Sequence, residues 1–223
     1  MAGGAVFWLI YFDLKDRLKP EPRRLLLLAF LLGGLAALLG LAAYRLAEWL
    51  GAPVSPGESQ SEILLYCLAL VGPIEEGAKF LVARALIFRW KQFDEPIDGL
   101  IYASAVAVGF AAVENLLYLP HLDWPEQLAR ALTSPLTHSL FAAIWGLGLI
   151  HARLHAPTRG ARFLLQALPL AASMLLHGFY DFLVIGPGAT LPASGIVLVL
   201  WLWMIVWARS VVRGRSRPYL LDR

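Results

Sequence analysis

The chain has 223 residues, of which 59% are hydrophobic and only 16% are charged, and its mean hydropathy is +0.65. This composition is too apolar for an ordinary soluble domain, so we expect an integral membrane protein. The net charge of +3 does not indicate a nucleic-acid partner, because the lysines and arginines are divided among separate connections and form no single basic face. The one cysteine, Cys67, excludes an intramolecular disulfide and a cysteine-rich metal site.

Seven apolar stretches follow one another along the chain. The first, at residues 2–12, is short, and it lacks the basic residues and the cleavage site of a signal peptide, so we expect a short or truncated first span. The other six approach or exceed the roughly 20 residues that a helix needs to cross the hydrocarbon core. They cover residues 25–43, 63–88, 99–119, 131–150, 163–185 and 189–208. We therefore predict an all-α fold, a polytopic membrane bundle of about seven transmembrane helices that forms a single domain over residues 1–223.

The connections between these stretches are alternately rich and poor in lysine and arginine. The rich ones hold Lys15, Arg17, Lys19, Arg23 and Arg24, then Arg89 and Lys91, then Arg153, Arg159 and Arg162, and finally Arg209, Arg213, Arg215, Arg217 and Arg223. Residues 51–61 and 186–189 hold none, and residues 120–130 hold only Arg130. Because lysine and arginine are retained in the cytoplasm, we expect the N-terminus outside and the C-terminus in the cytoplasm.

The stretch 63–88 contains two adjacent acids, Glu75 and Glu76. A carboxylate in hydrocarbon costs on the order of 2.5–3.5 kcal/mol by insertion scales unless a cation, a metal or water receives it, so the pair indicates a functional site. Glu75 and Lys79 lie four residues apart on one helix face, where an ion pair offsets part of the cost or simply fixes helix packing. Glu76 points about 100° away and has no such local partner. Pro73 is expected to disrupt backbone bonding just before the pair.

A third acid, Glu114, lies in the stretch 99–119 and is followed by Asn115 and Tyr118. Tyr118 lies one helical turn beyond Glu114 and could donate a hydrogen bond to it. Two structural alternatives remain at this point. Glu114 could be an interfacial residue near the outer end of its span, and Asn115 could serve hydrogen bonding between helices.

Two histidines, His138 and His177, lie in the stretches 131–150 and 163–185. Asp181 follows His177 by four residues, the spacing at which a carboxylate orients an imidazole for acid–base chemistry or metal ligation. A lone membrane histidine is more often a packing residue, but here two occur together with acids on other helices. At a rise of about 1.5 Å per residue, all these polar residues fall in the middle to outer part of the membrane. A single cavity open to the outside could contain them.

The order and spacing of these residues resemble the PrsW-type intramembrane proteases, which are relatives of the CAAX prenyl-protease and bacteriocin-processing superfamily. The resemblance rests on EEGAK at 75–79, EPIDGLIY at 95–102, GF at 109–110 with ENLLY at 114–118, His138, and HGFYDF at 177–182. It implies a multi-pass peptidase of the bacterial cell membrane. Such an enzyme makes an extracytoplasmic, site-1-like cut in a single-pass membrane protein, for example an anti-sigma factor.

The resemblance also implies which residues form the site. It assigns catalytic positions to Glu75, Glu76, Glu114, His138, His177 and Asp181, with Lys79 and Asn115 in supporting positions. One hypothesis places zinc or another divalent metal on Glu76, Glu114, His138 and His177, or with Glu75 among the ligands, while a remaining glutamate takes a proton from the attacking water. Asp181 would orient His177, and Lys79 would balance the acids. In the metal-free alternative, a glutamate alone activates the water.

Two rival functions are compatible with the same polar residues. A proton- or cation-coupled transporter also carries Glu, His and Lys inside the membrane, although the inverted repeats of many carriers are not evident here. A non-catalytic scaffold would use these residues only to fasten helices, and their replacement would then unfold the protein. The expected partners are the lipid bilayer and a single-pass substrate, not nucleic acid.

Overall fold

The computed structural model describes residues 7, 8, 10 and 20–221. Every regular element within that part of the chain is helical, which confirms the all-α prediction there. The elements are α2 (Arg23–Trp49), α3 (Gln60–Tyr66), the π-helical η1 (Cys67–Val71), α4 (Gly72–Ala85), η2 (Ile87–Arg89), α5 (Pro96–Tyr118), η3 (Leu119–His121), α6 (Trp124–His155), α7 (Arg159–Ile185) and α8 (Thr190–Leu221).

Four of the described helices are long and apolar enough to cross a membrane: α2, α5, α7 and the Thr190–Val211 part of α8. They coincide with the apolar stretches predicted at 25–43, 99–119, 163–185 and 189–208. The stretch 131–150 lies within α6, and the stretch 63–88 is divided among α3, η1 and α4. The predicted first span, 2–12, falls outside the described residues except for 7, 8 and 10. The chain is thus a helical membrane protein, while the total of seven spans and the orientation of the termini stay predictions.

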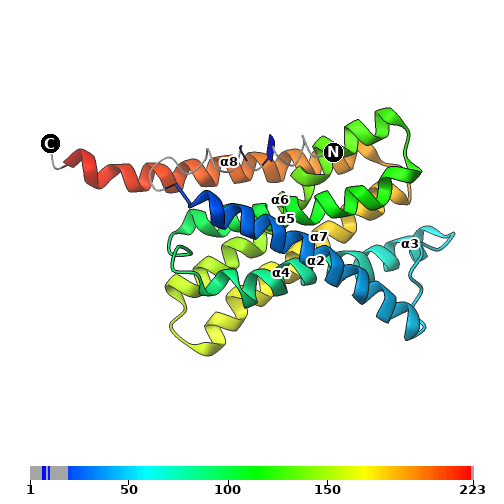
Figure 1. Ribbon diagram of the computed structural model, residues 1–223, viewed down its shortest axis with the longest axis horizontal. Coiled ribbons are helices and arrows are strands. Elements are labelled where there is room, and N and C mark those ends of the chain that lie inside the picture. Colours follow the sequence, from blue (N-terminus) through cyan, green and yellow to red (C-terminus); the bar gives the residue numbers. More distant parts are fainter. Residues whose placement is uncertain (1–6, 9, 11–19, 222–223) are drawn as a thin grey trace.

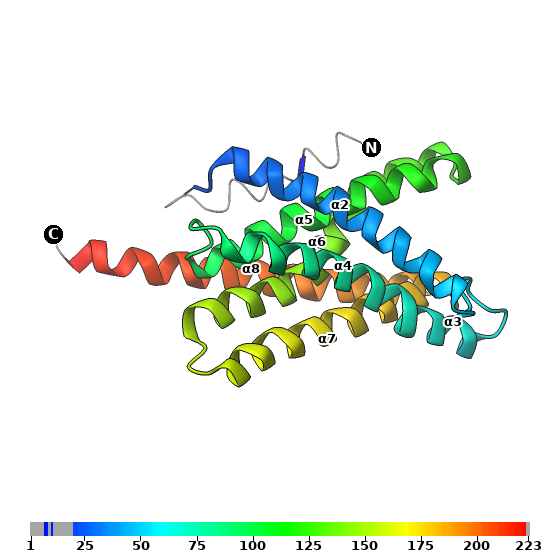
Figure 2. The same cartoon turned by 60° about the horizontal axis from the view of Figure 1, so that its bottom comes forward.

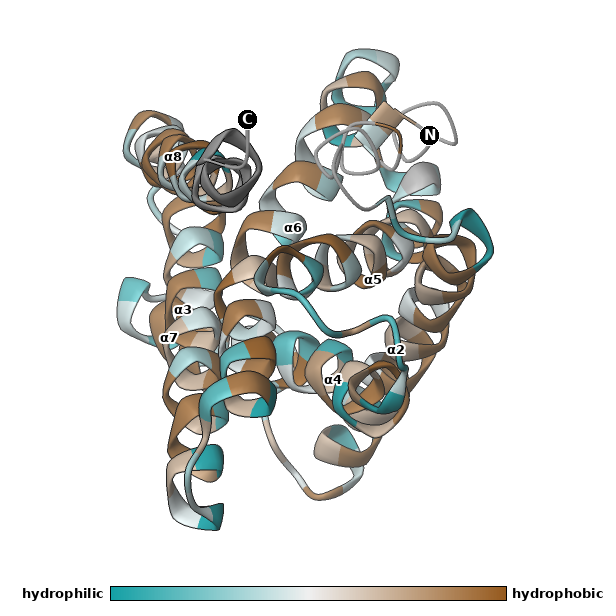
Figure 3. Ribbon diagram, turned by 90° about the vertical axis from the view of Figure 1, so that its left-hand side faces the viewer, coloured by the Kyte–Doolittle hydropathy of each residue, from teal (hydrophilic) through white to brown (hydrophobic). Residues whose placement is uncertain are grey.

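Helix α5 occupies the centre of the bundle. Almost all of its residues from Ile97 to Ala111 are buried, and it packs against α2 on one side and α6 on the other. Figure 3, in which the helices are seen nearly end on, shows α5 between α2 and α6, with α8 set apart at the edge. Helix α4 packs against both α2 and α7 (Figure 2). The C-terminal part of α8 extends beyond the other helices (Figure 1).

The helix that carries the two adjacent acids is interrupted one turn before them. Helix α3 begins with a capping box, in which Ser59 Oγ accepts from the Glu62 backbone N–H and the Glu62 carboxylate accepts from the Ser59 N–H. The π-helical η1 then precedes α4, whose second residue is Pro73. Because proline has no N–H to donate, a wider turn at this place agrees with the predicted disruption of backbone bonding.

Two glycines allow this interrupted helix to lie directly against α7. A Cβ atom at Gly72 would collide with the Met174 carbonyl oxygen, and one at Gly178 would collide with the Cys67 carbonyl oxygen. Only glycine permits backbones to approach this closely. The close approach brings His177, the residue before Gly178, within reach of the acids on α4.

Helix α6 supplies a second histidine from the opposite side of the site. It begins with a capping box between Asp123 and Glu126 and continues for 32 residues through Pro135. Ser139 Oγ bonds to the Pro135 carbonyl oxygen one turn later. Neither Pro135 nor Pro169 breaks its helix, since α6 and α7 are continuous at these residues.

Candidate active site

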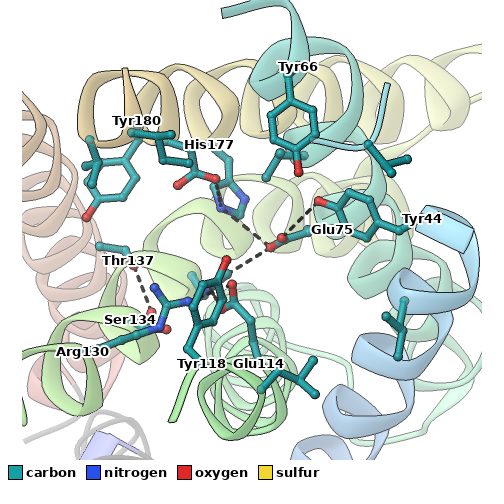
Figure 4. A pocket seen from close by; sticks show the side chains of 18 of the residues that line it. Tyr44, Tyr66, Glu75, Glu114, Tyr118, Arg130, Ser134, Thr137, His177 and Tyr180 are labelled. Atoms are coloured by element: carbon teal, nitrogen blue, oxygen red, sulfur yellow. Dashed lines mark hydrogen bonds and ion pairs between the residues drawn. The ribbon is translucent and has the colours of Figure 1, made fainter. Parts of the chain in front are cut away.

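Helices α2 to α7 enclose a pocket of about 530 Å³. The polar groups that line it come from all six of these helices and point toward one another (Figure 4). They include Tyr44, Tyr66, Glu75, Glu114, Tyr118, Arg130, Ser134, Thr137, His138, His177, Tyr180 and Asp181. The pocket thus brings together five of the six residues predicted to be catalytic. The sixth, Glu76, does not line it.

Glu75, His138 and His177 form the closest group of potential metal ligands among the described residues. One ligand atom of each lies within 4.8 Å of the other two, and all three side chains are buried. Glu75 Oε2 is 3.9 Å from His177 Nε2 and 4.0 Å from His138 Nδ1. This oxygen is buried but accepts no hydrogen bond from the described residues, although Tyr44 donates a long one, of 3.4 Å, to Oε1.

His177 is held by contacts on both edges and on its face. Its Nδ1 bonds to Glu76 Oε1 at 2.9 Å, which places the ring proton on Nδ1 when the imidazole is neutral. The ring stacks on Phe141 with centroids 4.9 Å apart. Its Nε2 is therefore the free nitrogen, and it faces the Glu75 carboxylate and, at 3.4 Å, Asp181 Oδ2. The acid at Nδ1, which orients the ring, is Glu76, whereas Asp181 lies on the pocket side.

His138 has a matching arrangement. Its Nε2 bonds to Glu114 Oε2 at 2.8 Å, and its Nδ1 lies 2.7 Å from the Lys79 ammonium nitrogen. A neutral ring donating from Nε2 to the carboxylate and accepting at Nδ1 from lysine satisfies both contacts. Each histidine thus bonds to a carboxylate through one ring nitrogen and turns its other ring nitrogen toward Glu75. A carboxylate partner of this kind commonly orients metal-binding imidazoles.

Glu76 has a different environment from the one expected. Its side chain is fully buried, with Oε1 accepting from Lys79 at 2.7 Å and Oε2 accepting from Trp145 Nε1 at 2.8 Å. The expectation that Glu76 lacks a local partner is wrong. Lys79 contacts Glu76 three residues away more closely than Glu75 four residues away, for which the separation is 3.9 Å. Positions three and four apart are both helix neighbours, and the long lysine side chain reaches either.

Glu114 is fixed by Arg130, a residue that the sequence pattern placed in a connection. Arg130 Nη2 lies 2.9 Å from Glu114 Oε1, and Arg130 Nε donates to Asn115 Oδ1 at 2.9 Å. The bond predicted from Tyr118 to Glu114 is replaced by this ion pair, and the guanidinium carbon lies 3.8 Å from the centroid of the Tyr118 ring. Asn115 does link two helices, α5 and α6, as its structural interpretation predicted.

The residues of the site that escaped the sequence interpretation include Arg130, Trp145 and Tyr44. Trp145 lies seven residues after His138, two helical turns along the same face, so helical spacing could have indicated it. Tyr44 directly follows the stretch 25–43 and had no motif to identify it. Arg130 directly precedes the stretch 131–150, so the sequence pattern places it in a connection and not in a helix.

The donor set fits a divalent metal ion. Two imidazole nitrogens and one carboxylate oxygen form a common set of protein ligands for catalytic zinc. The buried Glu75 Oε2 without a donor is the atom that such an ion would satisfy. The Lys79 ammonium lies close to His138 Nδ1, so an ion at this place would have to displace it from that nitrogen. Two of the ligands expected from the resemblance, His138 and His177, belong to this group. Its third member is Glu75, and neither Glu76 nor Glu114 belongs to it.

Known proteins similar to this chain are peptidases. The family described as "PrsW family intramembrane metalloprotease" matches residues 21–209. Protease PrsW of Geobacillus kaustophilus is 34% identical over 212 residues, which cover 94% of this chain and 89% of that protein. Protease PrsW of Bacillus subtilis is 32% identical over 211 residues, which cover 93% of this chain and 90% of that protein. No solved structure shows a significant match.

Proposed function

Since the chain belongs to the PrsW family of intramembrane metalloproteases, we propose that this membrane-embedded peptidase cuts a single-pass membrane protein near the extracytoplasmic side of a bacterial cell membrane. An anti-sigma factor is a substrate of the proposed kind. Family membership supports the peptidase activity. It does not support the transporter and scaffold interpretations. The proposal adds the substrate class, the side of the membrane and the residues that act.

The observation that carries the proposal is the buried group of Glu75, His138 and His177 at the pocket. Each histidine turns one ring nitrogen toward the Glu75 carboxylate, and its other ring nitrogen bonds to a different acid. A purely structural role for the cluster does not explain why Glu75 Oε2 is buried without a hydrogen-bond donor. In an active site, that atom is kept available for a metal ion or for a reacting water.

Glu75, His138 and His177 would hold the metal, for which zinc suits the donor set. When bound, such an ion polarises the scissile carbonyl and lowers the pKa of bound water. Asp181 is the acid best placed to receive a proton, because its side chain is 22% exposed to the pocket and its Oδ2 lies 3.4 Å from His177 Nε2. Glu76 keeps the His177 proton on Nδ1, and Lys79 balances the charge of Glu76.

The position of Lys79 also supports a metal-free version of the same reaction. Its ammonium already contacts Glu76 and His138 Nδ1, and it lies 3.9 Å from Glu75 Oε2. In this version Glu75 takes the proton from the attacking water as general base. Both versions hydrolyse a peptide bond and both require Glu75. They differ in the requirement for an ion and in the acid that takes the proton, which is Asp181 in the first version and Glu75 in the second.

The distribution of charges supports an extracytoplasmic cut. The pocket is lined from the C-terminal parts of α2, α5 and α7, together with Val54 in the connection between α2 and α3. That connection lacks lysine and arginine. At the opposite end of α7, Arg153 lies in the last turn of α6 and Arg159 is the first residue of α7. Because cationic segments stay in the cytoplasm, this distribution supports a pocket in the outer half of the membrane.

The test compares the unmodified chain with Glu75→Gln, a His138→Ala/His177→Ala double variant and the control His151→Ala. His151 lies on α6 with its Nδ1 bonded to the Leu147 carbonyl oxygen and does not line the pocket. Each full-length protein is produced in a bacterial host, and new N-termini of single-pass membrane proteins are identified by mass spectrometry. The metal content per chain is measured on the detergent-purified proteins.

In cells that carry the unmodified protein or His151→Ala, we expect single-pass membrane proteins to be cut on the extracytoplasmic side. We expect no such cuts with Glu75→Gln. About one metal ion per chain that disappears in the double histidine variant supports the metal site. Activity without bound metal selects the version in which Glu75 is the base. New N-termini that persist in Glu75→Gln would remove this residue from the mechanism, and cuts only on the cytoplasmic side would contradict the proposed orientation.

A further inference from the structure

Among the described residues, two arginines line the pocket, Arg45 and Arg130, and it is Arg130 that is bonded to the group around the histidines. It lies on α6, and its side chain is 28% exposed. Its guanidinium makes three contacts at once: Nη2 with Glu114 Oε1, Nε with Asn115 Oδ1, and its flat face with the Tyr118 ring. Figure 4 shows Arg130, Tyr118 and Glu114 together on the side of the pocket opposite Tyr66. The planar fork of arginine suits such simultaneous contacts, and the single ammonium of lysine does not.

Glu114 bridges Arg130 to His138. One carboxylate oxygen contacts Arg130 at 2.9 Å, and the other contacts His138 Nε2 at 2.8 Å. Because the two contacts use different oxygens, the carboxylate cannot rotate about its last bond without breaking one of them. Charge-assisted bonds of this kind are stronger and more directional than neutral ones. The position of Glu114 against His138 therefore depends on Arg130.

The bond from Glu114 determines which nitrogen of His138 faces the pocket group. A carboxylate at Nε2 accepts the ring proton, so Nδ1 of the neutral ring stays unprotonated. It is Nδ1 that lies 4.0 Å from Glu75 Oε2. The Lys79 ammonium, 2.7 Å from Nδ1, favours the same tautomer. If Glu114 turned away, the preference would rest on Lys79 alone, and the proton could move to Nδ1 in part of the molecules, where the nitrogen that faces Glu75 would become a donor. In metal sites generally, the group that bonds to the far nitrogen of an imidazole ligand fixes the tautomer in this way.

We infer that Arg130 is a positioning residue for His138: it holds the Glu114 carboxylate against His138 Nε2 and so keeps an unprotonated Nδ1 directed at Glu75. Asn115 and the Tyr118 ring in turn fix the guanidinium. The inference deepens the proposed function and rests on it, since it assigns a role within the same site. It gives Arg130 no contact with substrate.

The test reads the tautomer of His138 directly, in the metal-free full-length protein in detergent with chelator. Histidine labelled with ¹⁵N reports by NMR which ring nitrogen carries the proton. The chain has five histidines, so the His138 signals are identified by comparison with His138→Gln. Spectra are recorded above the usual histidine pKa of about 6.5. The variants are Arg130→Gln, Arg130→Lys and the control Arg45→Gln, whose arginine lines the same pocket but pairs with Glu48 on α2.

We expect the proton on His138 Nε2 in the unmodified protein and in Arg45→Gln. Arg130→Gln should populate both tautomers, and Arg130→Lys should lie between, because lysine keeps the charge but loses the fork. Proteolysis should fall roughly tenfold or more in Arg130→Gln, in kcat and not in KM, the scale on which outer partners of such ligands act. In a Glu114→Gln background, Arg130→Gln should change the tautomer no further.

A proton on His138 Nδ1 in the unmodified protein would overturn the inference. So would an unaltered His138 spectrum in a folded Arg130→Gln protein that has lost activity, because Arg130 would then act elsewhere, for example on substrate. The NMR measurement needs neither substrate nor metal. It therefore separates a failure of this inference from a failure of the proposed peptidase mechanism.

Discussion

Trp145 donates its indole N–H to Glu76 Oε2 at 2.8 Å, and this contact joins α6 to α4 beneath the pocket. Both side chains are fully buried. Glu76 Oε1 meanwhile contacts Lys79 at 2.7 Å and His177 at 2.9 Å. Glu76 thus binds partners from three helices, α4, α6 and α7, which is a structural role as much as a chemical one.

Replacement of Trp145 by Phe should destabilise the protein. The carboxylate oxygen stays buried after its donor is removed, and such an unsatisfied acceptor costs roughly 1–3 kcal/mol of unfolding free energy. Thermal unfolding in detergent, followed by circular dichroism, measures the change. The matched control is Trp201→Phe, because the Trp201 indole N–H is buried without a partner among the described residues. Equal destabilisation by both substitutions would show that the bond to Glu76 contributes nothing.

Glu76→Gln should lower stability and Glu75→Gln should not, although both should reduce proteolysis. Glu76→Gln leaves buried Lys79 without its close counter-ion, and loss of one partner of a buried ion pair costs about 3–5 kcal/mol. Glu75→Gln removes an acid whose Oε2 has no donor, so stability should not fall. Its activity should fall by roughly 10²–10⁴-fold if Glu75 is the general base.

Unfolding midpoints and cleavage rates of the two variants, measured in the same detergent, separate these roles. A folded Glu76→Gln protein with unchanged stability would show that Lys79 does not depend on Glu76. A Glu75→Gln protein that unfolds as readily as Glu76→Gln would make Glu75 a structural residue and not a reacting one.

The sequence predicted the long helices and most of the pocket residues because their signals are local. Apolar stretches of about 20 residues are sufficient to identify α2, α5, α7 and α8. Buried acids and histidines in such stretches are conspicuous because their burial is costly. Depth along each helix allowed one cavity to contain Glu75, Glu114 and the two histidines, and all four line the pocket.

The partners of these residues could not be predicted in the same way. Whether Lys79 turns toward Glu75 or Glu76 depends on a rotamer, and both acids are neighbours at helical spacing. Arg130 directly precedes an apolar stretch, and only the capping box at Asp123 shows that α6 begins earlier and carries Arg130 into the pocket. Long-range contacts such as Trp145 to Glu76 depend on how helices pack, which spacing along one helix does not determine.

Gly178→Ala should disturb the approach of α7 to the interrupted helix. A Cβ atom at this position meets the Cys67 carbonyl oxygen, and forced overpacking costs typically about 1–3 kcal/mol. The displacement should also move His177 away from Glu76 and reduce proteolysis. The control is Gly195→Ala on α8, where a Cβ atom meets nothing within 4 Å. Thermal unfolding and cleavage rates of both variants check this, and equal behaviour of the two would contradict the tight contact.

Tyr44→Phe tests whether the pocket hydroxyls take part in the reaction. Tyr44 donates to Glu75 Oε1 at 3.4 Å, a length at which hydrogen bonds are weak, so the hydroxyl stabilises Glu75 only slightly in the free protein. The same hydroxyl is free to turn to a substrate oxygen at little cost. We therefore expect Tyr44→Phe to lower kcat with little change in stability. Tyr66→Phe is the control, because Tyr66 lines the same pocket without a hydrogen bond to the described residues. Equal kcat values for the two variants would exclude a specific role for Tyr44, whereas a loss confined to Tyr44→Phe would place its hydroxyl among the groups that act on the reacting peptide.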